Sequence, residues 1–438
     1  MWNVVDLRLT HFAPGLLVPL SSYPALISGF LLLYASIYTH TITAQSLQAQ
    51  CTLTRLVLAP PAILLFWNFG FNASYNAPGV QVAVGMAVVG LYGIMRVIDT
   101  CIVPLIDPIP SVWIRKEEGV PMPIPTSTKE RLIYTFDLAT SLRGTSWFSD
   151  RHWNWVPSPL VNASTTHLTR RAYLSTTLLS FVVQYLFMDV IDSINKSRTW
   201  DITQRYPITS LPFPEQMVFA ICVCGSTILS ISVMYTLVAL VAVSLGSSPV
   251  NWPPMFDRPF HSGSLKEFWS RRWHAIFRRV FTRVSLLLLL PIPKKWQSVR
   301  IFIRMLIIFV LSAGMHVMLM YRLEREPSSH THASLVQIFT DPSILAFFLL
   351  QPVGLAVEAL VVLPLVSSVP TARREKEEKD RKLNWIGMAL MRVWSWGFML
   401  WAGRFWSDAW VRRGFWEERE HVVGWSLVRG VLKGEWKA

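Results

Sequence analysis

Long apolar runs recur along this chain, separated by shorter polar stretches that are rich in arginine and tryptophan. A helix that crosses a bilayer needs about 20 mostly apolar residues. Each of these runs approaches that length, so we expect an all-α polytopic membrane protein, with residues 1–438 forming a single membrane domain. The pattern predicts about eight transmembrane helices, over 15–38, 53–70, 79–98, 171–191, 216–245, 300–321, 342–366 and 384–407.

Composition supports this interpretation. Apolar residues make up 52% of the chain and charged residues only 16%, well below the share of about 25% in soluble domains. Twenty tryptophans fit a chain with many positions at the boundary between lipid and water. The net charge of +14 suits either an anionic cytoplasmic leaflet or an anionic soluble substrate. The four cysteines lack metal-ligand or disulfide spacing, so we expect them to be packing residues.

Basic loops predict the orientation, because lysine and arginine favour the cytosolic side. Segments 99–170, 246–299 and 367–383 carry most of the positive charge, and eight helices put all three on one side. We therefore expect an integral membrane protein of the endoplasmic reticulum with a cytosolic active-site entrance. Eight helices would make both termini lumenal, but the basic C-terminal tail favours the cytosol, so the side of the C-terminus stays open. Glycosylation sequons at Asn72 and Asn195 fall in predicted lumenal loops, and a third at Asn162 falls in a cytosolic one.

The stretch "SLKEFWSRRWHAIFRR", residues 264–279, predicts an interfacial amphipathic helix. Ser264 and Glu267 have the spacing of a capping box, which marks a helix start. A helical period from there to Val284 separates a tryptophan-rich apolar face from the arginines. His274 would project at the margin of the apolar face, one turn from Arg271 and Arg278. The alternative is a basic membrane anchor with an incidental histidine.

A second histidine, His316, lies about sixteen residues into the apolar run that begins near Arg300. Ionisable groups at this depth are costly and mark functional sites facing the protein interior or a water-filled cavity. The small residues of "SAG", 312–314, would let another helix or a ligand approach closely. The alternative is a neutral histidine that bridges two helices by hydrogen bonds.

Glu358 is the other charged group deep in an apolar run, with Gln351 two turns earlier on the same helical face. It would either orient a histidine or pair with a buried arginine. The sequence leaves these two alternatives open.

Four motifs occur in order: "WPPMFDRP", "SLKEFWSRRWH", "SAGMH" and "LLQPVGLAVE". Together they resemble the wax synthase-like branch of the membrane-bound O-acyltransferases, and most closely its fungal members that acetylate terpenoid and meroterpenoid natural products. The strong likeness covers roughly 250–360, within a wax synthase-like catalytic core over 246–366. Upstream, "LRGTSWFSDRHWNW" at 142–155 is similar to a tryptophan-rich segment of the fungal group.

This resemblance implies acyl transfer from acetyl-CoA, as a co-substrate, to the hydroxyl of a lipophilic alcohol, without a permanently bound cofactor. His316 takes the role of the catalytic histidine and His274 that of the upstream polar residue. Many relatives have asparagine at the second position, so an orienting role for His274 stays open. The remaining predicted site residues are Arg271, Arg272, Arg278, Arg279 and Trp273 for the CoA moiety, and Ser312, Gly314 and Glu358 for the substrate cavity.

Other functions fit the sequence less well. A long-chain wax ester synthase would share the same residues. A prenyltransferase needs two aspartate-rich motifs, and only Asp189 and Asp192 imitate half of one. His330 and His332 lack further ligands, so we expect no metal site, and we expect no nucleic-acid partner. A transporter would show inverted repeats and paired broken helices, whereas the prolines at 60–61 give only one break.

Overall fold

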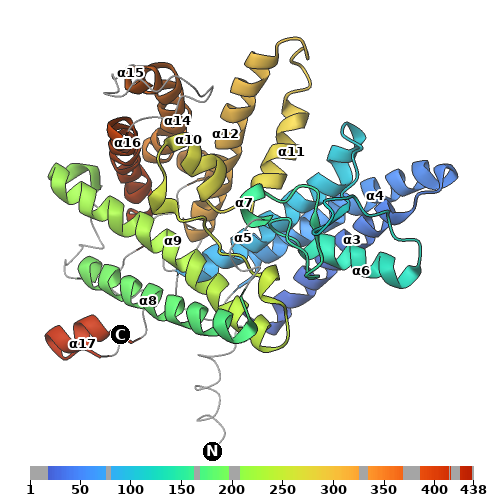
Figure 1. The fold of residues 1–438 in the computed structure, drawn as a ribbon, viewed down its shortest axis with the longest axis horizontal. Coiled ribbons are helices and arrows are strands. Elements are labelled where there is room, and N and C mark those ends of the chain that lie inside the picture. Colours follow the sequence, from blue (N-terminus) through green and yellow to red (C-terminus); the bar gives the residue numbers. More distant parts are fainter. Residues whose placement is uncertain are drawn as a thin grey trace, which may run out of the picture. The chain divides into compact units, whose positions relative to one another are not determined.

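A computed structural model describes residues 18–74, 80–161, 168–196, 208–324, 334–367, 385–413, 415 and 425–436. The sequon at Asn162 and the histidines at 330 and 332 lie outside these residues. Helices dominate the described part (Figure 1). They are α3 (Tyr23–Tyr38), α4 (Gln48–Trp67), α5 (Val80–Val97), α6 (Thr128–Thr140), α7 (Ser158–Val161), α8 (Arg170–Lys196), α9 (Phe213–Ser244), α10 (Leu265–Glu267), α11 (Arg278–Leu288), α12 (Gln297–Glu324), α13 (Leu335–Phe339), α14 (Pro342–Val357), α15 (Leu363–Ser367), α16 (Trp385–Val411) and α17 (Leu427–Lys433).

The predicted all-α membrane fold is confirmed. Within the described residues, seven helical segments are long and apolar enough to cross a bilayer. Helix α16 forms where the eighth was predicted, but it is not among the seven, because Arg392, Arg404 and Asp408 interrupt its apolar sequence. The seven spans are Leu20–Thr41, Gln45–Asn72, Val82–Leu105, Arg170–Asn195, Phe213–Ser244, Gln297–Glu324 and Leu335–Val366.

The chain divides into two compact units, and the predicted core 246–366 contributes to both. Unit 1 comprises Met1–Val161, Val250–Trp252 and Ile276–Ile338, and unit 2 comprises Asn162–Pro249, Pro253–Ala275 and Phe339–Ala438. His316 belongs to unit 1 and His274 to unit 2.

Helices α3, α4 and α5 form the core of unit 1 together with α6. The backbones of α4 and α5 approach closely around Gly90. A Cβ atom added there would lie 2.7 Å from the Phe66 carbonyl oxygen and 2.8 Å from the Gly70 Cα. Only glycine fits at this crossing, so the contact between the two helices depends on it.

A short two-stranded antiparallel sheet contains part of the tryptophan-rich segment at 142–155. Strand β1 (Trp113–Arg115) pairs with β2 (Arg151–Trp153), with Trp113 opposite Trp153. The Asp137 carboxylate of α6 accepts hydrogen bonds from the Trp113 indole, at 2.7 Å, and from the Trp147 amide, at 2.8 Å. Burial raises the pKa of Asp137 despite these bonds. The segment therefore has a structural role in unit 1.

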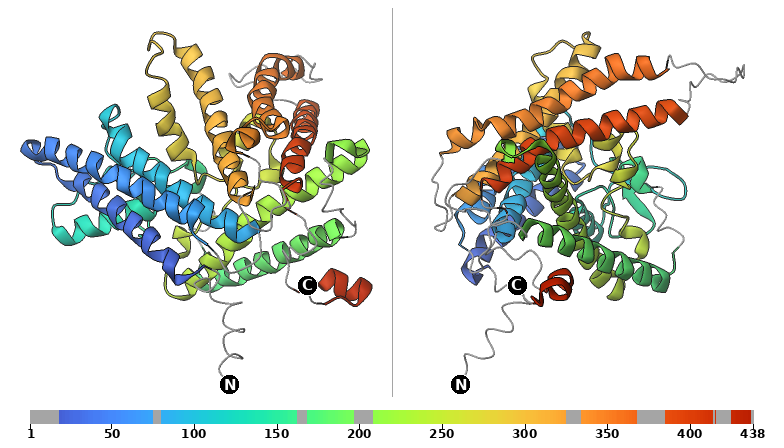
Figure 2. Two further views of the ribbon diagram at one scale, coloured as in Figure 1. Left: turned by 180° about the vertical axis from the view of Figure 1, so that it is seen from behind. Right: turned by 90° about the vertical axis from the view of Figure 1, so that its left-hand side faces the viewer.

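Unit 2 contains four long helices in sequential contact, α8 with α9, α9 with α16 and α16 with α14. The second view in Figure 2 shows α14 and α16 lying side by side. Their contact is tight at Gly354, where an added Cβ would lie 2.4 Å from the Phe398 ring. At one end of the pair, the Asp341 carboxylate accepts hydrogen bonds from Arg412, both at 2.9 Å, and from Arg413, at 2.8 Å.

Candidate active site

His316 is half-buried on α12, one of the seven spans. Its Nδ1 lies 2.7 Å from the carbonyl oxygen of Ser312, one turn earlier on the same helix. A carbonyl oxygen can only accept a hydrogen bond, so this contact assigns the hydrogen to Nδ1. In the neutral ring the lone pair is then on Nε2, and Nε2 is the nitrogen that can act as a general base.

The small residues near His316 differ in what they contact. The Ser312 backbone orients the imidazole through the bond described above. A Cβ atom added at Gly314 would meet no described atom within 4 Å, so alanine would fit there without moving any of these neighbours. No described helix therefore approaches Gly314 closely, and a role for this residue beside a ligand stays a prediction.

The predicted helix start at Ser264 is confirmed. The Ser264 hydroxyl accepts from the Glu267 amide at 3.0 Å, while the Glu267 carboxylate accepts from the Gly263 amide at 2.8 Å. Burial would raise the pKa of Glu267, but the Gly263 amide and the Arg272 guanidinium together hold it below its ordinary value. This cap fixes where α10 begins.

The predicted continuous helix from Ser264 to Val284 is wrong. Helix α10 continues only as a π-helical turn, Phe268–Arg272, and Trp273 is extended. In a continuous helix the Arg272 carbonyl would accept from the amide four residues later. Here it accepts instead from the amide of Asp257, at 3.2 Å, and the Arg272 guanidinium donates to the Asp257 carbonyl at 3.0 Å. These bonds to the preceding loop end the helix.

His274 therefore lies in an irregular link between two helices, and not on a helical face one turn from Arg271 and Arg278. Its ring is half-buried against aromatic neighbours in unit 2. The ring centroid lies 5.0 Å from that of Trp273 and 5.9 Å from that of Phe256. Aromatic packing thus restricts how the imidazole can turn.

Glu358 and Gln351 hold the segment that leads to His274. The Glu358 carboxylate accepts from the backbone amides of Leu265, at 2.6 Å, and Lys266, at 3.1 Å. Gln351 Oε1 accepts from the Trp269 indole at 3.0 Å. The observed contacts of Glu358 thus match neither predicted alternative, a histidine or a buried arginine. It caps α10, where the positive end of the helix dipole favours a carboxylate.

The predicted CoA-binding arginines have different surroundings. Arg272 is largely buried and bonds Glu267 at 2.6 Å, so its charge is already paired. Arg279 is likewise paired, with Asp99. Arg271 bonds Asp257 at 3.1 Å but keeps 57% of its side chain exposed, and Arg278 is exposed. Arg271 and Arg278 are therefore the more exposed of these four arginines.

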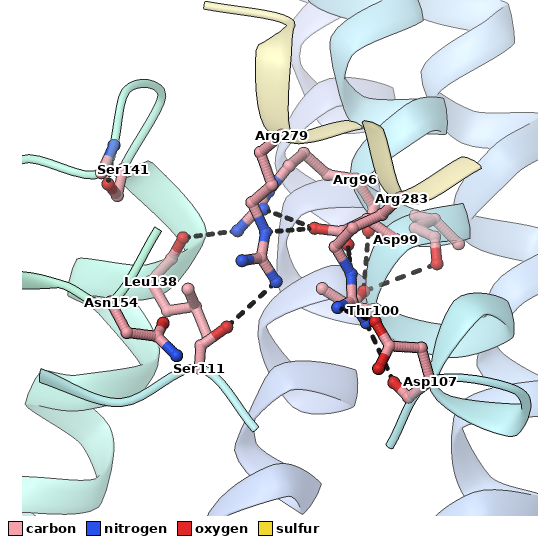
Figure 3. Close-up of polar contacts among 12 residues, drawn as sticks. Arg96, Asp99, Thr100, Asp107, Ser111, Leu138, Ser141, Asn154, Arg279 and Arg283 are labelled. Carbon is pink, nitrogen blue, oxygen red and sulfur yellow. Dashed lines mark hydrogen bonds and ion pairs between the residues drawn. The ribbon is translucent and has the colours of Figure 1, made fainter. Parts of the chain in front are cut away.

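A buried ionic cluster in unit 1, which the sequence interpretation missed, surrounds Asp99 (Figure 3). The Asp99 carboxylate bonds Arg96 at 2.9 Å, Arg279 at 2.8 Å and Arg283 at 2.6 Å. Arg279 also donates to the Ser111 hydroxyl at 3.0 Å. The cluster fastens α11 to the end of α5. Asp99 and Asp107 of the first basic segment thus contact Arg279 and Arg283 of the second.

The sequence feature that could have indicated this cluster is the pair Arg96 and Asp99, three residues apart at the end of an apolar run. Their partners on α11 lie about 180 residues later in the chain, so the pattern could not identify them. A second missed residue is Arg322 near the end of α12, whose guanidinium donates to the carbonyl oxygens of Phe71 and Ala73, at 2.8 and 2.6 Å. It ties the helix of His316 to the end of α4.

Comparison with known proteins bears on the segment that holds both histidines. Residues 252–349 match the profile of the Membrane bound O-acyl transferase family. The predicted resemblance to this family is confirmed. The prediction of an acyltransferase enzyme is confirmed with it, since similar curated proteins are acetyltransferases.

Three of these relatives come from fungi. Acetyltransferase ple2 of Rhodocybe pseudopiperita is 22% identical over 74% of this chain and 76% of the relative. Acetyltransferase ataH of Aspergillus terreus is 24% identical over 54% of this chain and 78% of its own length. Acetyltransferase spyB of Aspergillus fumigatus is 31% identical over shorter shares, 20% of this chain and 16% of the relative. The family match at 252–349 and these relatives together support membrane-bound O-acyltransferase activity.

Proposed function

We propose that this acyltransferase moves an acetyl group from acetyl-CoA to the hydroxyl of a hydrophobic, terpenoid-type natural product. The observation that carries the proposal is His316. It lies on a membrane-spanning helix, within the segment that matches the family, with its tautomer set by the Ser312 carbonyl. We propose acetyl-CoA as the acyl donor because the relatives are named acetyltransferases. We propose a lipophilic acceptor because the general base lies on a membrane-spanning helix, which a substrate dissolved in the bilayer can reach.

In the proposed reaction, Nε2 of His316 takes the proton of the acceptor hydroxyl as its oxygen attacks the thioester carbon. An alcohol is a poor nucleophile at neutral pH, so this proton transfer is needed for attack. The tetrahedral intermediate then collapses, the carbon–sulfur bond breaks, and the thiolate of CoA receives the proton. The products are an acetate ester and CoA, and His316 returns to its neutral form.

His274 is proposed to donate a hydrogen bond to the oxyanion of the intermediate, or to orient a group that does. Arg271 and Arg278 are proposed for the phosphates of CoA, because their guanidinium groups are exposed. Arg272 is proposed to act indirectly, through its bonds to Glu267 and the loop before α10. Trp273 is proposed to restrict the His274 ring.

The proposed location is the endoplasmic reticulum, with the CoA entrance on the cytosolic side. Asn195 is buried within α8 and so is a poor glycosylation site, whereas Asn72 is exposed. Glycosidase treatment should therefore shift the wild-type band and leave Asn72→Gln unshifted. A glycan that persists in Asn72→Gln and disappears in Asn162→Gln would contradict the proposed orientation and support the reverse one.

Membranes that contain the full chain, incubated with labelled acetyl-CoA and a panel of terpenoid alcohols, test the activity. We expect labelled ester with wild type and a loss of about 100- to 10,000-fold with His316→Gln, in line with the contribution of general bases. His274→Asn should retain more activity than His274→Ala, because an amide can still donate. A preference for long-chain acyl-CoA over acetyl-CoA would instead identify a wax ester synthase.

A further inference from the structure

Two buried aspartates on α8 have no part in the proposed acyl transfer. Asp189 and Asp192 lie near the end of a membrane span, and both side chains are almost fully buried. They are the pair that imitates half of a diphosphate-binding motif. Charged groups at such positions are costly unless they are paired or hydrogen-bonded, so their partners show what the pair does.

The partners come from the end of the chain itself. The Ser426 hydroxyl and the Val428 amide both donate to the Asp189 carboxylate, the amide at 2.9 Å. Arg429 lies 3.4 Å from the Asp192 carboxylate. The hydroxyl of Tyr185, also on α8, donates to the Trp425 carbonyl at 2.7 Å. The carboxylates thus hold residues 425–436, which we call the C-terminal clasp.

The clasp is closed on itself. Its first and last described parts meet where the Ser426 amide donates to the Trp436 carbonyl at 3.1 Å, and the rings of Trp425 and Trp436 stack at 5.6 Å. The Trp436 ring covers Gly430 so closely that an added Cβ would lie 2.3 Å from it. Because the short helix α17 is held by these contacts, its outward side chains have fixed positions.

The exposed side chains of the clasp include several large apolar ones beside the polar Lys433 and Glu435. Val431 is 68% exposed and Leu432 is 76% exposed, and both tryptophans are partly exposed beside them. Figure 1 shows α17 beside α8, whose own apolar surface is also exposed, for example at Phe187. Exposed apolar side chains are thus present both on the clasp and on the candidate membrane span that it contacts.

The anchor points also set the depth of the clasp. Asp189 precedes the last residue of the span, Asn195, by six positions. At a rise of about 1.5 Å per residue, Asp189 lies about 9 Å from the end of the span. The end of a membrane span lies near the boundary between headgroups and acyl chains, where amphipathic helices bind and tryptophan is enriched.

We propose that the C-terminal clasp is a membrane-surface anchor whose partner is the lipid bilayer at the end of α8. Val431 and Leu432 enter the outer part of the acyl-chain region, and the two tryptophans lie at headgroup level. Asp189 and Asp192 hold the clasp at the required depth, which explains two buried carboxylates in a span without assigning them any chemistry.

Site-directed labelling of the full chain in lipid nanodiscs tests this proposal. An environment-sensitive fluorophore is attached to Leu432→Cys, and the matched control is Glu435→Cys, an exposed polar position in the same clasp. The native cysteines are buried or half-buried, and their labelling is measured in the unsubstituted protein. Quenching is compared between lipids brominated on the acyl chain and aqueous iodide.

We expect brominated lipid to quench the label at position 432 several-fold more than the label at 435, and iodide to do the reverse. Equal quenching of both labels by iodide would overturn the proposal, because Leu432 would then face water. Protection of position 432 from both quenchers, with disulfide cross-linking between two Leu432→Cys chains, would also overturn it and identify a second copy as the partner.

Discussion

Replacing Glu358 with leucine removes the acceptor for two backbone amides at the start of α10. The Leu265 amide is buried, and the Lys266 amide lies beside it near the surface. Leucine cannot accept a hydrogen bond, and the hydroxyl of Ser264 is already used by the Glu267 amide. The substitution therefore leaves two donors without their acceptor and puts an apolar side chain of similar size in place of the carboxylate.

The cost can be worked from these contacts. A buried donor that loses its partner costs about 1–3 kcal/mol, and a group that water can reach costs less. The buried amide of Leu265 and the more accessible amide of Lys266 together give a loss of about 2–3 kcal/mol for Glu358→Leu. Glu358→Gln keeps one acceptor oxygen, so about half of that loss is expected.

Hydrogen exchange of the peptide that covers residues 262–273 measures this loss directly. Because each 1.4 kcal/mol is a factor of ten, exchange of the two amides should accelerate about 30- to 150-fold in Glu358→Leu and by less in Glu358→Gln. Under the proposed function, the rate of acetyl transfer should fall in the same order, because this segment leads to His274.

Ser395→Ala provides the control for Glu358. The Ser395 hydroxyl lies 3.5 Å from the Glu358 carboxylate but donates to the Met391 carbonyl at 2.7 Å, so its loss should leave exchange near the wild-type rate. Unchanged protection of residues 265–272 in Glu358→Leu would refute the reasoning. Faster hydrogen exchange in Glu358→Leu with an unchanged rate of acetyl transfer would instead show that this helix cap is not needed for catalysis.

Three further predictions concern other contacts. Asp99→Asn removes the carboxylate shared by the buried Arg96 and the partly buried Arg279 and Arg283, of which, among the described residues, only Arg283 keeps a second carboxylate, that of Asp107. It should cost about 3–5 kcal/mol of stability, seen as earlier thermal exposure of the buried cysteines to a thiol-reactive dye; an unchanged midpoint would contradict this. Gly314→Ala should fold normally and lower kcat/KM for bulky acceptors more than for small ones, and uniform kinetics would place Gly314 away from the acceptor. The pKa of Glu267 is lower in the folded protein than the value of about 4.3 in the unfolded chain, so the Glu267–Arg272 pair stabilises the fold fully above that pH. This stability is lost as the pH falls through the folded pKa. Glu267→Gln should therefore make the free energy of unfolding depend less on pH in this acid range.

The membrane helices were predictable because a span is a local property of about 20 consecutive residues. Predicted and observed bounds differ mainly at the ends, as for 53–70 against the observed span Gln45–Asn72. Pro60 and Pro61 do not divide that helix. Helix α16 shows that length alone does not identify a span, because its apolar run is long enough but the arginines within it lower its mean hydropathy.

The candidate site was only partly predictable. The cap at Ser264 depends on residues three apart, so the sequence identified it, whereas the helix end at Arg272 depends on the backbone of Asp257, fifteen residues away. Glu358 was correctly singled out as a buried charge, but the two amides that donate to it lie more than ninety residues earlier in the chain. No periodic pattern reports such a partner, and only the folded chain identifies it.

The interleaving of the two units along the chain has a consequence for biogenesis. Unit 1 needs residues 276–338 and unit 2 resumes only after them, so neither can be completed from one uninterrupted stretch of nascent chain. The hydrophobic core of α3 to α6 uses only residues before 161, but the ionic cluster at Asp99 is complete only after Arg279 and Arg283 of α11 have been synthesised. Ribosome release before residue 338 should therefore yield a substrate for quality control rather than a stable fragment.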